Sequence, residues 1–132
     1  MIEKVSKEVA EKDINAWLDY KNVKATKRES FKAQIDLLTE SIQSGEVEVD
    51  DKTFTITQKL NTPIEGLGIT ELTYKPRLSV GEMRRGATNV KPMDFVGNVV
   101  ANIATATGKG MSVIDKMDSA DYDVAQAIAV FF

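Results

Sequence analysis

The segment Ala106–Ser112 has residue types that could bind a phosphate group. Glycine, lysine and serine close together are the parts of a phosphate-binding loop, in which backbone N–H groups surround phosphate oxygens. That motif requires a glycine five positions before Gly108, where the chain has Ile103. It also requires Ser or Thr directly after Lys109, where the chain has Gly110. We therefore interpret the segment as the glycine-rich end of a helix.

Three aspartates, Asp118, Asp121 and Asp123, are the best candidates for holding a metal ion. Their spacing differs from that of a calcium loop, which also needs a glycine and a terminal glutamate that are missing here. Negative charge is in any case favourable at the N-terminus of a helix, where the pattern places them. We predict that no metal is bound.

The composition restricts the chemistry further. The chain contains no cysteine and no histidine, so thiolate nucleophiles, thiolate metal sites and imidazole bases are excluded. The remaining carboxylates define no recognisable catalytic arrangement. We therefore expect a protein that is not an enzyme, with no catalytic residue and no cofactor.

Basic residues are concentrated in one block of the chain. Between Ile69 and Lys91 five basic residues face two acids, whereas from Pro92 onward two lysines face five aspartates. Such a block could contact nucleic-acid phosphates, but no aromatic residues are interleaved with it and the sequence pI is about 5.0. A pair of solvated faces of opposite charge is the simpler interpretation. The basic residues are Lys75, Arg77, Arg84, Arg85 and Lys91.

The first 45 residues predict a helical hairpin. Residues 3–12 are strong helix formers, and Asp13 is placed to cap a second, amphipathic helix that carries Trp17. Thr26 and Glu29 fit a capping box that opens a helix over residues 27–43. Residues 46–76 then predict a β meander, because the hydrophobic period changes from about 3.6 to two.

The predicted meander has three strands. Glu46–Asp50 and Thr53–Thr57 alternate polar and apolar residues around a turn, and Ile69–Tyr74 forms the third strand. Asn61–Pro63 is expected to break the second strand, because proline cannot donate to a sheet ladder. The side chains expected to point inward are Val47, Val49, Phe54 and Ile56.

Residues 77–132 predict a helical subdomain. Ser79 and Glu82 repeat the capping-box pattern, and Pro92 in a first-turn position with Asp94 precedes an apolar helix that runs to about Ala106. Asp118 opens a last helix, and the sequence finishes on Phe131-Phe132. Because two exposed phenylalanines would each forfeit about 1.5–3 kcal/mol of burial, this pair is expected to be core or interface.

These elements together predict one α+β domain of 132 residues. Its parts are a helical hairpin (1–45), a small three-stranded antiparallel sheet (46–76) and a C-terminal helical bundle (77–132). No apolar run approaches the roughly 20 residues that cross a bilayer, and the first fifteen residues are charged. We therefore expect no membrane segment and no secretory signal.

Residues 58–132 contain several short motifs that occur together in one viral family. The motifs are Gln58–Ile64 with its proline, Ile69–Leu72 with a proline four residues on, Ala106-Thr107-Gly108, and Ile114–Tyr122 before an apolar end. In this pattern the chain resembles the tail assembly chaperones of contractile-tailed phages, the group of small gpE-like tail assembly proteins. The helical hairpin at residues 1–45 is not part of the family pattern. The segment Lys75-Pro76-Arg77 is more basic than is expected at that place in the family.

The resemblance implies a chaperone in the host cytoplasm that coats an apolar helical tape-measure chain until tail tube subunits replace it. The implied partners are tail proteins, the tape measure and the tail tube, and self-association is left open. Two other functions also remain open: a structural tail or baseplate component of the virion, and a nucleic-acid-binding regulator using residues 75–91. The residues expected to bind a partner are Phe95, Val99, Ile128, Phe131 and Phe132 as a groove, with Arg77, Arg84 and Arg85 as a charged rim. Ordinary core is the alternative for each apolar residue.

Overall fold

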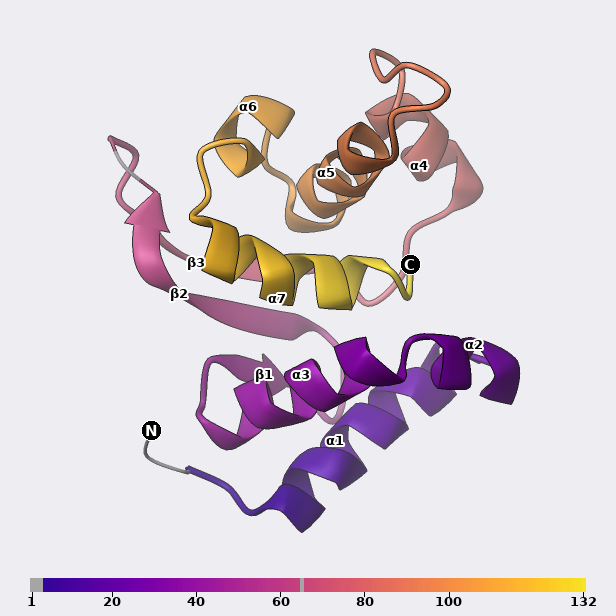
Figure 1. The fold of residues 1–132 in the computed structure, drawn as a ribbon, viewed down its shortest axis with the longest axis vertical. Coiled ribbons are helices and arrows are strands. Elements are labelled where there is room, and N and C mark those ends of the chain that lie inside the picture. The colour runs from indigo at the N-terminus through magenta and orange to yellow at the C-terminus, as the bar shows by residue number, and fades with distance from the viewer. Residues whose placement is uncertain (1–3, 65) are drawn as a thin grey trace.

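The structure, a computed structural model, describes residues 4–64 and 66–132. It confirms the α+β class. Helices precede and follow a three-stranded antiparallel sheet along the chain, and the strands lie in the order β1-β2-β3. Helix α7 crosses the middle of the molecule, between α1, α3 and β2 on one side and α4, α5 and α6 on the other (Figure 1). The elements are α1 (Lys7–Tyr20), α2 (Ala25–Ser30), α3 (Lys32–Gln43), β1 (Val47–Val49), β2 (Ile56–Ile64), β3 (Ile69–Tyr74), α4 (Val80–Gly86), α5 (Phe95–Thr107), α6 (Met111–Ile114) and α7 (Ser119–Ala129).

The N-terminal helices differ from the predicted pair. One continuous helix, α1, replaces the two helices expected around Asp13, and Ser6 caps it by accepting a hydrogen bond from the Val9 N–H. Continuity is favoured because Ala10, Ile14 and Trp17 form one buried stripe along the whole helix. A break at Asp13 would divide that stripe.

The helix predicted over residues 27–43 is divided at Phe31. The chain there leaves helical geometry (φ −109°, ψ 30°), so α2 and α3 are separate helices. Lys24 is the N-cap of α2 and Thr26 lies inside it, so the capping box expected from Thr26 does not form. The interruption accompanies a tertiary contact: the Phe31 ring packs edge-on against Phe131, with centroids 5.9 Å apart.

The sheet has the predicted strand order but a longer second strand. β1 pairs with β2 from Val47 opposite Gln58 to Val49 opposite Ile56, and β3 has the predicted bounds. β2 continues through the break predicted at Asn61–Pro63. Proline is tolerated because β1 pairs only with the first part of β2 and leaves the later part at an edge.

Residues 50–55 form a loop rather than the start of a strand. Asp50 closes the loop by accepting hydrogen bonds from the Lys52 and Thr53 N–H groups, and these bonds lower the pKa of its carboxyl group. Phe54 has a positive φ of 58°, in the left-handed region. Its ring stacks on Tyr20, 4.4 Å between centroids, and is partly buried against the core.

The C-terminal helices begin mostly where their caps predict. Ser79 and Glu82 form the expected capping box, and Asp118 caps α7 through the Ala120 N–H. Asp94 is the N-cap of α5 and accepts from the Gly97 N–H, so Pro92 precedes the helix instead of standing in its first turn. Gly108, at φ 70°, ends α5 in the left-handed conformation, as expected of a helix end.

The core is a single cluster to which α1, α3, all three strands, α5 and α7 contribute. A buried polar network joins α7 to β2. The Asp121 carboxylate accepts hydrogen bonds from the backbone N–H groups of Asn61 and Thr62, both at 3.0 Å. The Gln58 amide donates to the Asp121 carbonyl and accepts from the Tyr74 hydroxyl, 2.6 Å away.

Within the described ranges, no helix combines the length and apolar character needed to cross a membrane.

Candidate binding surface

Three apolar side chains stand exposed at the start of α5. Met93, Phe95 and Val96 keep 77%, 74% and 66% of their surface accessible, far more than large apolar residues usually do when they have a packing partner in the fold. We call these three residues the α5 patch. Exposed apolar side chains that are adjacent, unlike scattered ones, are typical of binding sites.

The local sequence explains why this turn of α5 is left uncovered. Asp94 fixes the helix start, so Phe95 and Val96 occupy the first turn. Helix α4 packs further along α5, where Gly86 approaches Ala101 and Thr105 so closely that a side chain at Gly86 would collide with Thr105. The first turn of α5 therefore extends beyond the part that α4 covers.

A shallow hollow of about 260 Å³ continues the patch toward α6 and α7. Val96 belongs to both surfaces, and Val100, at the next turn of α5, forms part of the hollow wall. Apolar side chains dominate the lining, which gives a continuous apolar strip from the α5 patch to the start of α7. The other lining residues are Ile114, Asp115, Met117, Ser119 and Tyr122.

The residues predicted to form one groove lie in different environments. Ile128 and Phe131 are 0% and 3% exposed, so these two side chains are core residues and line no open surface. Phe131 packs edge-on against Trp17, 5.8 Å between centroids, and Phe132 is partly buried beside it. Val99 is also partly buried. Of the five, only Phe95 is largely exposed.

The three predicted rim arginines also separate into two groups. Arg77 is engaged within the fold: its guanidinium lies 4.6 Å over the Tyr20 ring and donates to the Tyr20 carbonyl. Arg84 and Arg85 are exposed beside a shallow surface hollow and form no ion pair with any described residue.

The prediction missed Met93 and Val96 as surface residues, because an apolar helix start looks the same in sequence whether it is covered or not.

A second feature that the sequence did not indicate is the environment of Lys21. Its ammonium group donates to the Pro76 carbonyl at 2.8 Å and lies 4.0 Å from the centre of the Phe132 ring. Burial, together with the positive charges of Arg77 and Lys27, lowers the pKa of Lys21 from 10.5 to about 8. This lysine joins the end of α1 to the segments that follow β3 and α7.

The lowered pKa of Lys21 predicts a rise in stability with pH. Because the folded protein releases this proton near pH 8 and the unfolded chain near 10.5, the folded state binds fewer protons between these values, and unfolding becomes less favourable as pH rises. We expect the free energy of unfolding of the native chain, minus that of Lys21→Met, to increase from pH 7.5 to 9.5 in urea titrations. A flat or falling difference would contradict the environment described for Lys21.

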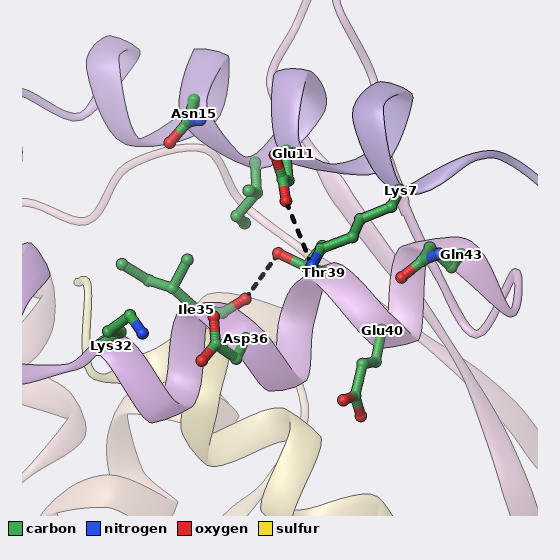
Figure 2. A pocket seen from close by; sticks show the side chains of 10 residues that line it. Lys7, Glu11, Asn15, Lys32, Ile35, Asp36, Thr39, Glu40 and Gln43 are labelled. Atoms are coloured by element: carbon green, nitrogen blue, oxygen red, sulfur yellow. Dashed lines mark hydrogen bonds and ion pairs between the residues drawn. The ribbon is translucent and has the colours of Figure 1, made fainter.

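Another hollow, of about 740 Å³, lies between α1 and α3 (Figure 2). Charges of both signs line it: Lys7 pairs with Glu11 at 3.9 Å across one turn of α1, and Lys32 stands on α3. The Thr39 hydroxyl is already occupied, because it donates to the Ile35 carbonyl at 2.9 Å. No group of three or more acidic residues in the described part of the chain is placed to hold a metal ion. The mixed lining favours no single class of ligand.

The aspartates considered as metal ligands have structural contacts. Asp118 caps α7, and the buried carboxylate of Asp121 binds the β2 backbone. Asp123 lies exposed on α7. The three carboxylates therefore do not form a common metal-binding site.

The fold and its surfaces thus define a small α+β protein whose most exposed large apolar side chains include three neighbours at the start of α5. Comparisons with models of protein families, with curated proteins and with solved structures found no match to this chain. The resemblance to tail assembly chaperones therefore stays a prediction.

Proposed function

We propose that this chain is a non-enzymatic phage tail assembly protein, a chaperone that binds an apolar helical segment of the tape measure or of the tail tube protein. The observation that supports the proposal is the α5 patch with its adjoining hollow. A helix can present apolar residues at successive turns to such a strip, which is how amphipathic helices bind grooves. The motifs in residues 58–132 point to tail assembly as the setting.

The same surface would suit a permanent component of the tail or baseplate, and the location of the protein distinguishes the two functions. A chaperone leaves before the particle is complete, so we expect the chain in infected cells and not in purified virions. Recovery of the chain in virions at a fixed ratio to the tube protein would favour the structural component.

A nucleic-acid-binding regulator has less support from the geometry. Of the basic block, Lys75 pairs with Glu82 at 3.2 Å and Arg77 stacks on Tyr20, so two of its five cations already have partners on the surface of this chain. The remaining three are Arg84, Arg85 and Lys91. Binding to DNA or RNA that weakens steeply with added salt would revive this alternative.

Phe95→Asp tests the proposed binding surface. Because an exposed aromatic anchor at the centre of an interface commonly contributes 2 kcal/mol or more, we expect capture of co-expressed tape measure or tube protein to fall by about 30-fold or more. Phe95 is 74% exposed, so the melting temperature of the variant should stay unchanged.

Val9→Asp is the matched control, since Val9 is an exposed apolar residue on α1, outside the α5 patch. We expect it to capture the tail protein as the native chain does. Equal loss in both variants, or no loss in Phe95→Asp, would show that the α5 patch is not the binding surface.

A further inference from the structure

We propose that the α5 patch also binds a second copy of this chain, in a two-fold dimer that forms when no tail protein is bound. This inference deepens the proposed function, on which it rests for the role of the dimer, because both partners would use one surface. The proposal comes from the distribution of charge around the patch.

One side of α5 is basic. Helix α4 and the loop that joins it to α5 lie on this side in Figure 1 and carry Arg84, Arg85 and Lys91. All three side chains are exposed, and none forms an ion pair with a described residue. The nearby acid Glu82 is occupied by Lys75 and by the Ser79 N–H, which lower the pKa of its carboxyl group.

The opposite side of α5 is acidic. Helix α6 and the start of α7 lie there (Figure 1), and Asp115 lines the hollow that continues the patch. Residues 115–123 contain four aspartates and one lysine, and of the aspartates only Asp121 is buried. Asp115, Asp118 and Asp123 therefore face water together with Lys116.

This arrangement is self-complementary. In a two-fold dimer both copies use the same surface, so every contact between two different residues occurs twice, once in each direction. Two α5 patches facing each other about a two-fold axis that runs along α5 would place the basic side of one copy against the acidic side of the other, at both ends of the interface. A partner with one uniform charge would match only one side, which is why a second copy fits this surface better.

The dimer has a consequence for the proposed function. Because the copies cover each other's α5 patch, the apolar surface is shielded until a tail protein competes for it. Binding of the tail protein and dimerisation then exclude each other, so the apparent affinity for the tail protein should fall as the concentration of the chain rises.

Two charge-reversed variants of the full chain test the proposal. The first carries Arg84→Glu, Arg85→Glu and Lys91→Glu, and the second carries Asp115→Lys and Asp123→Lys; Asp118 is kept because it caps α7. Light scattering after size exclusion should find twice the monomer mass for the native chain. Each variant alone should be a monomer, with a dissociation constant raised at least 10-fold, because like charges then face each other. An equimolar mixture should return to twice the monomer mass, since opposite charges meet again at both ends.

Phe95→Asp should also be monomeric, whereas Lys12→Glu, an exposed change on α1, should dimerise like the native chain. Circular dichroism checks that every variant is folded. A native chain that is monomeric at all concentrations, a mixture that stays monomeric, or a dimer that survives Phe95→Asp would overturn the dimer. A monomeric native chain that still captures a tail protein through Phe95 would overturn only the dimer, whereas a Phe95-dependent dimer that captures no tail protein would overturn only the proposed function.

Discussion

Phe131→Ala is expected to lower the free energy of unfolding by about 3–5 kcal/mol, the usual cost of removing a buried aromatic ring from a packed core. Phe131 is 3% exposed and packs edge-on against both Trp17 and Phe31. Its ring thereby joins α1, α3 and the end of α7, and truncation would leave a cavity among all three. Urea denaturation followed by tryptophan fluorescence measures the loss, since Trp17 reports on this contact.

Phe95→Ala is the control for Phe131→Ala. It removes the same ring from a site that is 74% exposed, so its effect on stability should stay within about 0.5 kcal/mol. If Phe131→Ala cost less than about 1 kcal/mol and instead abolished self-association, Phe131 would be an interface residue, as the sequence analysis predicted.

Asp121→Ala is expected to cost about 2–3 kcal/mol, because hydrogen bonds to a charged acceptor are stronger than neutral ones and two are lost together. The Asp121 carboxylate is 2% exposed and is the acceptor for the N–H groups of Asn61 and Thr62, where β2 no longer pairs with β1. Without it, β2 loses both hydrogen bonds to the Asp121 side chain, and the bond from the Gln58 amide to the Asp121 carbonyl remains between β2 and α7.

Two substitutions calibrate this result in the same urea titration. Asp123→Ala removes an exposed carboxylate two residues further along α7 and should be close to neutral. Asp121→Asn keeps one acceptor oxygen and should lose about half as much as Asp121→Ala. Equal stability of Asp121→Ala and Asp123→Ala would mean that water replaces the carboxylate at β2 without cost.

Core residues and α5 patch residues should affect different properties of the protein. Substitution of Phe131 or Asp121 should lower the stability of the protein, and the variants that still fold should bind the partner normally. Substitution of Phe95 should weaken binding and leave stability unchanged. This separation is measurable in one set of purified variants, and it is the most direct way to decide which apolar residues serve the fold and which serve a partner.

Local sequence was sufficient wherever a short-range interaction decides the structure. Ser79 with Glu82, Asp118 and Gly108 mark helix ends through hydrogen bonds or backbone angles that involve only nearby residues. The third strand, Ile69–Tyr74, was likewise predictable because β-branched and aromatic residues are frequent in it, with Gly68 before it and Pro76 after it. The fold class followed from these elements.

Tertiary contacts decided the rest. Phe31 interrupts a helix that its sequence would continue, in contact with Phe131, a hundred residues away. β2 runs through Pro63 because Asp121, far along the chain, binds the strand backbone where β1 has ended.

For the candidate site, the sequence determined the inventory: no cysteine, no histidine, apolar residues at the start of α5 and charges divided into a basic and an acidic block. It could not determine which apolar residues are covered. Phe95 and Phe131 are alike in sequence terms, each an aromatic residue in or beside an apolar helix. Only the packing of α4 further along α5 and of Trp17 on Phe131 leaves the first exposed and buries the second, because burial depends on which distant surfaces meet and not on the residue itself.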